Sequence, residues 1–183
     1  MSEGAAAPPP LAALRKRLVE LKARIDSREE TERRLRAAGA SYESTLHQRD
    51  LYFRGVRGRL KLRLQRPGED QLVWYDRVNL ASTKESQIVL CALPADHGLE
   101  AVLTAAFGVR VVVSKVRRVF SWNGTRVHVD DVKDLGSFLE FERPVEPEAT
   151  TVSAHAELRA MLAQLGIGET ALESGSYSDL LRP

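Results

Sequence analysis

Strict alternation of basic and apolar residues at positions 59–64 (RLKLRL) constrains the fold more than any other feature of the sequence. Side chains of a β-strand point alternately to its two faces, so such a stretch has one apolar and one cationic face. The apolar face holds Leu60, Leu62 and Leu64, and the cationic face holds Arg59, Lys61 and Arg63. An ordinary strand with a solvated face shows the same alternation, so this segment alone leaves open where the cations point.

Two other segments repeat the design with carboxylates added. Near the start, Glu20 and Lys22 alternate with apolar residues, and further on Glu140 and Glu142 do the same. Opposite charges therefore lie on the polar faces of strands that are far apart in the sequence. If these faces converge in the fold, they form a pocket that holds both cations and carboxylates.

The composition limits the classes of function. The 183 residues are 43% hydrophobic and 28% charged, with a formal net charge of +2, as in a soluble globular protein. A general nucleic-acid binder usually carries a strong basic excess on one surface, so no nucleic-acid partner is expected. Any anion site must be a local cluster of basic residues.

Length, termini and cysteine content set further expectations. Residues 1–16 are expected to be a disordered or helical leader without the features of a signal peptide, and residues 17–183 a single domain. No apolar run is long enough to cross a bilayer, so no membrane partner is expected. The single Cys91 lies in an apolar run and is expected to be a core residue. These features favour the cytoplasm, a reducing compartment.

Capping signals predict three helices. Ser27 precedes Glu30 by three residues, a capping pattern at the start of the first helix. Asp96 is expected to cap a second helix. Ser153 is expected to cap a third over residues 154–165, where apolar residues recur at helical spacing.

Runs of β-branched, aromatic and alternating residues predict the strands. They are expected at residues 18–25, 48–53, 59–64, 72–78, 85–90, 109–120, 125–132 and 138–143. Asn123 and Gly124 form the strongest hairpin signal, because both residues accept the positive φ angles of a tight turn.

About eight antiparallel strands with three helices between and after them predict an α+β fold. We expect an eight-stranded antiparallel β-barrel, or a strongly curved sheet, with the helices packed outside. In a barrel the polar faces point into a shared interior, where crowded like charges need counter-ions or a ligand.

The alternation assigns ten charged residues to that interior. The basic ones are Lys22, Lys61, Arg63, Arg77, Lys115 and Arg117. The acidic ones are Glu20, Asp130, Glu140 and Glu142. Arg and Lys form charge-assisted bonds to phosphate oxygens, and clustered carboxylates bind Mg²⁺ or Mn²⁺. A metal-bound polyphosphate would satisfy both groups together.

Other chemistries find less support in the sequence. Zinc sites favour Cys and His, but Cys91 is alone and the four histidines show no ligand spacing, so we treat the histidines as ordinary residues. A serine-hydrolase elbow, a Walker loop and a dinucleotide fingerprint are absent from the sequence. Glu140 and Glu142 resemble a glycosidase pair, but they share one face among proposed cations, which favours phosphate.

With these residues in view, the chain resembles the CYTH superfamily of triphosphate tunnel metalloenzymes, in its class IV adenylyl cyclase-like and thiamine triphosphatase-like branch. The resemblance covers residues 18–181. It rests on residues 19–24 (VELKAR), 58–63 (GRLKLR), 115–118 (KVRR), 127–132 (VHVDDV), 135–142 (LGSFLEFE) and 175–181 (GSYSDLL).

The resemblance implies a triphosphate tunnel. Phosphate would be held by Lys22, Lys61, Arg63, Arg77, Lys115 and Arg117, and Mg²⁺ or Mn²⁺ would be faced by Glu20, Asp130, Glu140 and Glu142. Lys22 would also help to position the nucleophile. The family signature Glu-x-Glu-x-Lys here begins with Leu18, which removes one inward carboxylate and makes the catalytic expectation weaker than the binding expectation.

Three functions remain open on this reading. The first is metal-dependent hydrolysis of inorganic or organic triphosphate, which demands less of the site than cyclisation does. The second is conversion of ATP to cyclic AMP and pyrophosphate. The third is a module that binds phosphate or polyphosphate without turnover, and a homodimer is compatible with all three.

Overall fold

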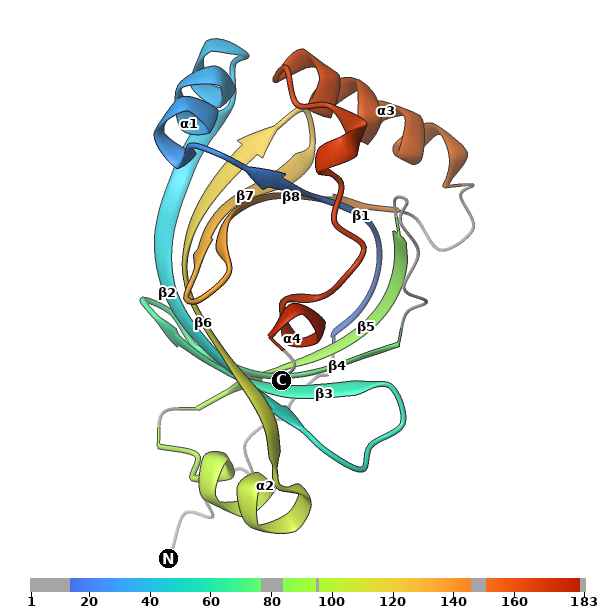
Figure 1. Ribbon diagram of the computed structural model, residues 1–183. Coiled ribbons are helices and arrows are strands. Elements are labelled where there is room, and N and C mark those ends of the chain that lie inside the picture. Colours follow the sequence, from blue (N-terminus) through green and yellow to red (C-terminus); the bar gives the residue numbers. More distant parts are fainter. Residues whose placement is uncertain (1–13, 77–83, 95, 146–150, 182–183) are drawn as a thin grey trace, which may run out of the picture.

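The computed structural model describes residues 14–76, 84–94, 96–145 and 151–181. Within them, eight antiparallel strands form a closed barrel in the order β1-β5-β4-β3-β2-β6-β7-β8 (Figure 1). The strands are β1 (Leu14–Ile25), β2 (Ser41–Phe53), β3 (Arg59–Arg66), β4 (Asp70–Asp76), β5 (Lys84–Leu93), β6 (Val109–Trp122), β7 (Thr125–Val132) and β8 (Gly136–Pro144). The predicted α+β barrel is confirmed.

Strand β1 closes the barrel because it pairs with two neighbours. Its first part, residues 14–20, pairs with β5, and its second part, residues 18–25, pairs with β8. A closed barrel has no free edges, and its inward side chains share one enclosed space.

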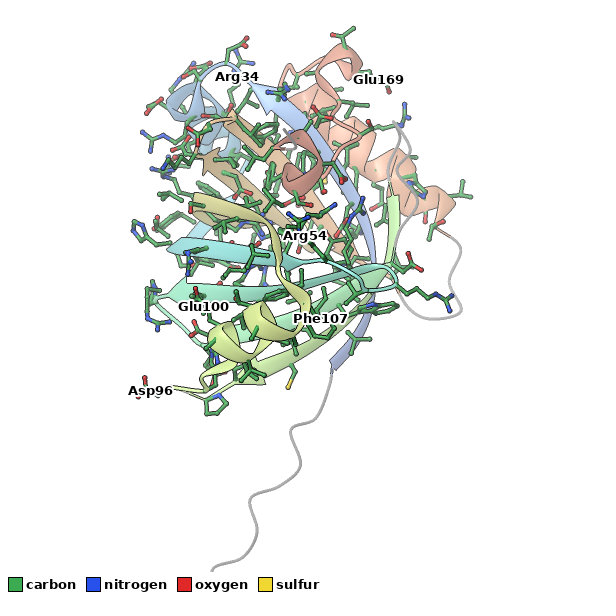
Figure 2. The ribbon with its side chains drawn as sticks, turned by 60° about the horizontal axis from the view of Figure 1, so that its bottom comes forward. Arg34, Arg54, Asp96, Glu100, Phe107 and Glu169 are labelled. Atoms are coloured by element: carbon green, nitrogen blue, oxygen red, sulfur yellow. The ribbon has the colours of Figure 1, made fainter. Side chains whose placement is uncertain are left out.

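The alternation along β3 divides the residues as predicted. Lys61 and Arg63 line the interior of the barrel. Leu62 is fully buried on the outer wall, in an apolar cluster with Leu51 of β2 and, from helix α2 (Leu99–Phe107), Leu103. Figure 2 shows α2 across the outside of the strands, with Glu100 and Phe107 on it. The leucine face therefore binds a helix, and the cationic face points inward.

A second outer cluster lies on the opposite side of the barrel, under helices α1 (Arg28–Ala37) and α3 (Val152–Gln164) (Figure 1). Leu35 of α1 and Leu158 of α3 are fully buried there against Phe120 of β6 and Phe141 of β8. The helices thus cover apolar outer faces of strands, and this burial stabilises the barrel from outside.

The segment after α3 reaches the opening of the barrel. It contains a short 3₁₀ helix, Glu169–Ala171, and ends in helix α4 (Tyr177–Leu180), which lies within the ring of strands in Figure 1. Ser176 and Asp179 form a reciprocal capping box at its start. Tyr177 packs in an inner apolar cluster with Phe138, which closes this end of the barrel.

Several predicted boundaries hold. The Ser27 hydroxyl accepts a hydrogen bond from the Glu30 backbone N–H at 3.2 Å, as the capping pattern requires. Asn123 and Gly124 have φ angles of 48° and 71°, as a tight hairpin turn requires.

Other boundaries were wrong. Residues 14–16 of the expected leader belong to β1, because they pair with β5. Helix α2 is capped at Gly98 and not at Asp96; the His97 Nδ1 accepts a hydrogen bond from the Leu99 backbone N–H there. Helix α3 begins at Val152, with Thr151 as its cap in place of Ser153, and α4 adds a fourth helix to the three expected.

Among the described residues, no helix is both long enough and apolar enough to cross a membrane.

Replacing Leu62 with alanine tests the apolar outer wall. The change leaves a cavity between β3 and α2, so we expect the free energy of unfolding to fall by about 2–5 kcal/mol in chemical denaturation. Val102→Ala is the control, because Val102 is 61% exposed on the same helix; it should change stability by no more than about 0.5 kcal/mol. Equal effects of the two changes would contradict the assigned packing.

Candidate functional site

A cavity of about 310 Å³ lies inside the barrel, bounded by all eight strands and, at one end, by Tyr177 of α4. Among the described residues that line it, six are cationic: Lys22, Lys61, Arg63, Lys115, Arg117 and Arg126. Three are carboxylates: Glu20, Glu140 and Glu142. The cavity surface thus carries more positive than negative side chains, which suits an anionic ligand.

The structure brings together most of the charged residues that the sequence assigned to the interior. Lys22, Lys61, Arg63, Lys115 and Arg117 line the cavity with Glu20, Glu140 and Glu142. Asp130 lies behind the cavity wall, with none of its surface exposed. Arg77 lies outside the described residues, so its predicted phosphate contact stays a prediction.

Strand register explains why distant residues meet here. In β1 and β8, Glu20 lies opposite Glu142 and Lys22 opposite Glu140. In β7 and β8, His128 lies opposite Glu140. Residues directly opposite each other on antiparallel strands point to the same face and lie about 5 Å apart at Cβ, so three strands contribute to one group of side chains.

Asp130 binds the two cations of β6 that line the cavity, Lys115 and Arg117. Its carboxylate accepts hydrogen bonds from the Arg117 guanidinium at 2.7 and 2.6 Å and lies 3.5 Å from the Lys115 ammonium. The Tyr177 hydroxyl donates to it at 3.0 Å. Burial would raise the pKa of Asp130, but the charges of Arg117 and Lys115 reverse this and hold the pKa below its usual range.

The predicted metal contact of Asp130 stays a prediction, and the structure shows what surrounds this carboxylate. Its two oxygens are engaged by a guanidinium, an ammonium and a phenol, and it does not line the cavity. A carboxylate in this position orients Arg117 toward the cavity and neutralises part of its charge.

Asp50 of β2 binds Lys61 and Arg63 of β3 in the same way, a contact that sequence reasoning missed. It is 1% exposed, and its carboxylate lies 3.1 Å from the Lys61 ammonium and accepts two bonds of 2.8 Å from Arg63. Burial would raise the pKa of Asp50, but Arg63 and Lys61 hold it well below its usual value. Only the pairing of β2 with β3, which sets Asp50 opposite Arg63, could have revealed this contact.

The Tyr177 ring lies between two lysines. The Lys22 ammonium is 3.9 Å from the ring centroid, and the Lys115 ammonium is 5.0 Å from it. Burial and the neighbouring Asp130 and Glu140 raise the pKa of Tyr177 well above its usual value, so the phenol stays neutral and donates its proton to Asp130. An aromatic face stabilises ammonium groups held in this way.

Glu140 lines the cavity and also has two cations beside it. It accepts a bond of 2.6 Å from Arg117 and lies 3.6 Å from the Lys22 ammonium. Burial would raise the pKa of Glu140, but the charges of Lys22 and Arg117 contribute to holding it well below its usual value. The group therefore remains an anion inside the barrel.

Comparison with known proteins agrees with this geometry. The model of the CYTH domain matches residues 16–177, most of the chain. The chain belongs to the CYTH domain family. It is also 22% identical over 169 residues to a protein of Methanocaldococcus jannaschii named "Putative adenylate cyclase", with 88% of this chain and 97% of that protein covered.

Solved structures of similar shape support the fold of this CYTH domain. The PH1012 protein of Pyrococcus horikoshii matches with a TM-score of 0.79 and 20% identity over 90% of this chain and 99% of the other. A Hippeastrum protein, described as a "Putative adenylyl cyclase" with a dominant triphosphatase activity, matches with a TM-score of 0.66 and 14% identity, over 90% and 93% of the two chains. At these identities the likeness establishes the fold alone.

The cavity of this CYTH domain contains donors suited to a divalent cation. Glu140, Glu142 and His128 each place one donor atom within 4.8 Å of the other two. Two carboxylates and an imidazole can bind Mn²⁺ and similar ions, and carboxylates alone suit Mg²⁺. His128, which the sequence gave no reason to single out, is therefore part of the site. The only signal for it in the sequence was its place on the same strand face as Arg126 and Asp130.

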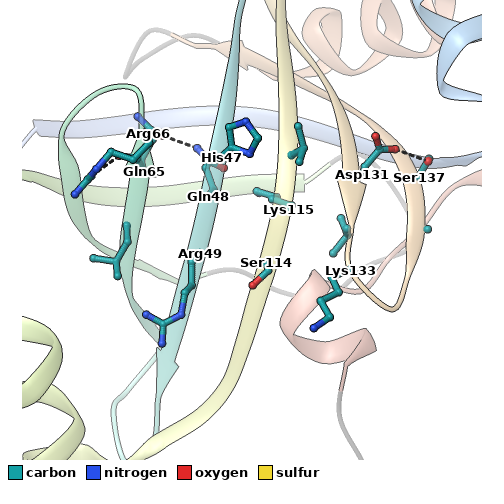
Figure 3. Close-up of a pocket in the computed structure, with 14 residues that line it drawn as sticks. His47, Gln48, Arg49, Gln65, Arg66, Ser114, Lys115, Asp131, Lys133 and Ser137 are labelled. Atoms are coloured by element: carbon teal, nitrogen blue, oxygen red, sulfur yellow. Dashed lines mark hydrogen bonds between the residues drawn. The ribbon is translucent and has the colours of Figure 1, made fainter.

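A larger hollow of about 680 Å³ lies on the outer wall of the barrel, beside β2, β3 and β6 (Figure 3). Three of its charged side chains are paired outside the barrel: Arg49 with Glu100, Arg66 with Asp70, and Asp131 with Arg118. The hollow is open, and Asp131 is the one carboxylate among its described lining residues, so it lacks the group of carboxylates that a divalent cation needs. The smaller interior cavity is the better candidate site on chemical grounds.

The pH dependence of stability tests the burial of Lys115. Burial and the neighbouring Arg117 lower its pKa to about 7, against about 10.4 in an unfolded chain. The protonated lysine therefore disfavours the folded state fully below pH 7, and this cost disappears as the pH rises toward 10. The unfolding free energy of the wild type, relative to Lys115→Met, should rise by up to about 1.4 kcal/mol per pH unit across this window.

Denaturation curves of both proteins between pH 6 and 10 measure this difference. Lys133→Met is the control, because Lys133 is exposed on the turn between β7 and β8 and its removal should give no such slope. A difference between wild type and Lys115→Met that stays constant with pH would contradict the assigned environment.

Proposed function

We propose that this CYTH domain is a divalent-cation-dependent triphosphatase, which hydrolyses inorganic triphosphate or the terminal phosphate of an organic triphosphate. One observation carries the proposal: cations from β1, β3, β6 and β7 outnumber carboxylates on the surface of one enclosed cavity. A triphosphate together with a divalent cation has a net negative charge that matches this excess.

The positions of the cations suit a chain of phosphates. Arg63 and Lys61 lie on β3, held by Asp50 of β2, and Arg117 and Lys115 lie on β6, held by Asp130 of β7. These four strands are neighbours in the barrel. Guanidinium and ammonium groups form charge-assisted bonds to phosphate oxygens. Because their carboxylate partners lie behind them, these cations keep their orientation toward the cavity before a ligand arrives, which reduces the cost of ordering the site.

Hydrolysis requires water to attack the terminal phosphorus, forming a new P–O bond while the bridging P–O bond breaks and diphosphate, or a nucleoside diphosphate, leaves. Charge on the transferring group is stabilised by the arginines and lysines that contact its oxygens. Lys22, next to Glu140, would help to orient the attacking water. A divalent cation held by Glu140 and Glu142 would neutralise further charge on the phosphates.

The size of the cavity favours a compact substrate. Ligand sites typically measure about 300–1,000 Å³, and this one, at about 310 Å³, lies at the lower limit. Tripolyphosphate needs no pocket for a base or sugar. Cyclisation of ATP needs a pocket that orients the ribose 3′-hydroxyl, so hydrolysis is the function that the site supports best, and formation of cyclic AMP is an outcome to be tested.

A substrate panel tests the proposal. Purified protein is incubated with tripolyphosphate, ATP or thiamine triphosphate in the presence of Mg²⁺ or Mn²⁺, and phosphate, pyrophosphate and cyclic AMP are measured. We expect metal-dependent release of phosphate, fastest with tripolyphosphate. Arg63→Ala and Glu142→Gln should each lower kcat/KM by about 100-fold or more, because each removes a charge that contacts the reacting groups or their cation.

Arg49→Ala is the matched control, because Arg49 lies on the outer wall and pairs with Glu100; its activity should remain at the level of the wild type. Release of pyrophosphate together with cyclic AMP would show that the protein cyclises ATP and would contradict the proposed hydrolysis. Tight metal-dependent binding of tripolyphosphate without any product would show a binding module in place of an enzyme.

A further inference from the structure

Two buried polar atoms of residues that line the cavity have no hydrogen-bond partner among the described residues: Nδ1 of His128 and Oε1 of Gln48. Only the first lies beside carboxylates that could share a cation with it. His128 is 3% exposed. A buried polar atom without a partner is costly, so most such atoms in folded proteins are satisfied by protein, water or a ligand. The Nδ1 atom of His128 therefore marks a place where a ligand is expected.

The two nearest acceptors lie at distances that are long for a hydrogen bond. The Nδ1 atom is 3.5 Å from Oε1 of Glu142 and 3.8 Å from Oε2 of Glu140. Hydrogen bonds between nitrogen and oxygen extend to about 3.2 Å. Two ligands of one metal ion, each bound at about 2.1 Å, lie up to about 4.2 Å apart. The spacing thus fits two ligands of a shared cation better than a direct bond.

We propose that His128 supplies a nitrogen ligand to the divalent cation of this cavity, together with Glu140 and Glu142, and thereby favours Mn²⁺ and other transition-metal ions over Mg²⁺. This inference rests on the proposed function, because it concerns the cation of the same site. Magnesium prefers oxygen ligands in an octahedral arrangement. Imidazole binds first-row transition metals more readily, so one nitrogen donor changes the preference of the site.

The surrounding strands are consistent with this role. His128 on β7 lies opposite Glu140 on β8, so the backbone register holds the imidazole beside that carboxylate. Arg117 shares Oε2 of Glu140 and lies 4.0 Å from Glu142. A carboxylate oxygen has more than one lone pair, so Glu140 can accept from Arg117 and bind a cation together.

Leu18 makes the nitrogen donor relevant. It lines the same cavity from β1, two residues before Glu20, and it cannot bind a metal. The carboxylates that remain in the cavity are Glu20, Glu140 and Glu142 among its described lining residues. His128 adds a donor from a different strand, and the resulting set of ligands contains nitrogen as well as oxygen.

Binding of Mn²⁺ to the purified wild-type protein, without substrate, tests the inference directly. Electron spin echo envelope modulation of the bound ion should show coupling to a histidine nitrogen. In His128→Gln this coupling should be lost. The affinity for Mn²⁺, measured by calorimetry, should fall by at least about tenfold, because even losing an outer partner of a metal ligand costs about that much. The affinity for Mg²⁺ should change much less.

His47→Gln is the matched control, because His47 is exposed on the outer wall of β2, and it should keep both the nitrogen coupling and the Mn²⁺ affinity. Glu142→Gln should lower the affinity for both Mn²⁺ and Mg²⁺, since it removes a carboxylate ligand. The absence of nitrogen coupling in the wild type, or equal coupling in His128→Gln, would overturn the inference whatever the fold of the variant.

The outcomes also separate this inference from the proposed function. Metal-dependent release of phosphate without histidine coupling would support the proposed triphosphatase activity and contradict the ligand role of His128. Histidine coupling without any product from the substrate panel would support the proposed metal site and contradict the triphosphatase activity.

Discussion

Buried ion pairs behind the cavity wall are the interactions on which the rest of this structure depends. Closure of the barrel by β1 leaves its inward side chains without a solvated face, and moving a charge out of water costs several kcal/mol unless a partner compensates. Asp50 and Asp130 supply this compensation, each to one arginine and one lysine. Because both carboxylates lie beneath the cations, the donors remain directed at the ligand space.

The outer faces of the strands stabilise the fold, and the inner faces form the candidate binding site. On the outside, leucines and phenylalanines pack under α1, α2 and α3, and their burial supplies the stability that a charged interior cannot. On the inside, α4 and Tyr177 close one end and hold Lys22 and Lys115 beside an aromatic ring. The outer packing can therefore hold the barrel together while the interior carries the charged residues.

Period-two geometry made much of this predictable. Alternation alone placed the pair Lys61 and Arg63 and the intervening Leu62 on opposite faces, and the predicted barrel made the charged face the inner one. Contacts between side chains of different strands were harder to predict, because they depend on the strand register, which no local sequence pattern specifies. Asp50 was missed for that reason, and Asp130 was expected to face a metal although β6 places Arg117 opposite it. Alternation put His128 on the same face as Arg126 and Asp130, but its position opposite Glu140 again depends on register. The predicted N-cap of α2 was wrong because the helix begins after Gly98 and not after Asp96.

A crystal structure of the protein with tripolyphosphate and Mn²⁺ tests the central claim most directly. We expect phosphates inside the barrel in contact with Arg63 and Arg117, and anomalous scattering from manganese between Glu140 and Glu142. Phosphate and manganese bound in the outer hollow beside His47 and Arg66, with the barrel interior free of both, would contradict the account.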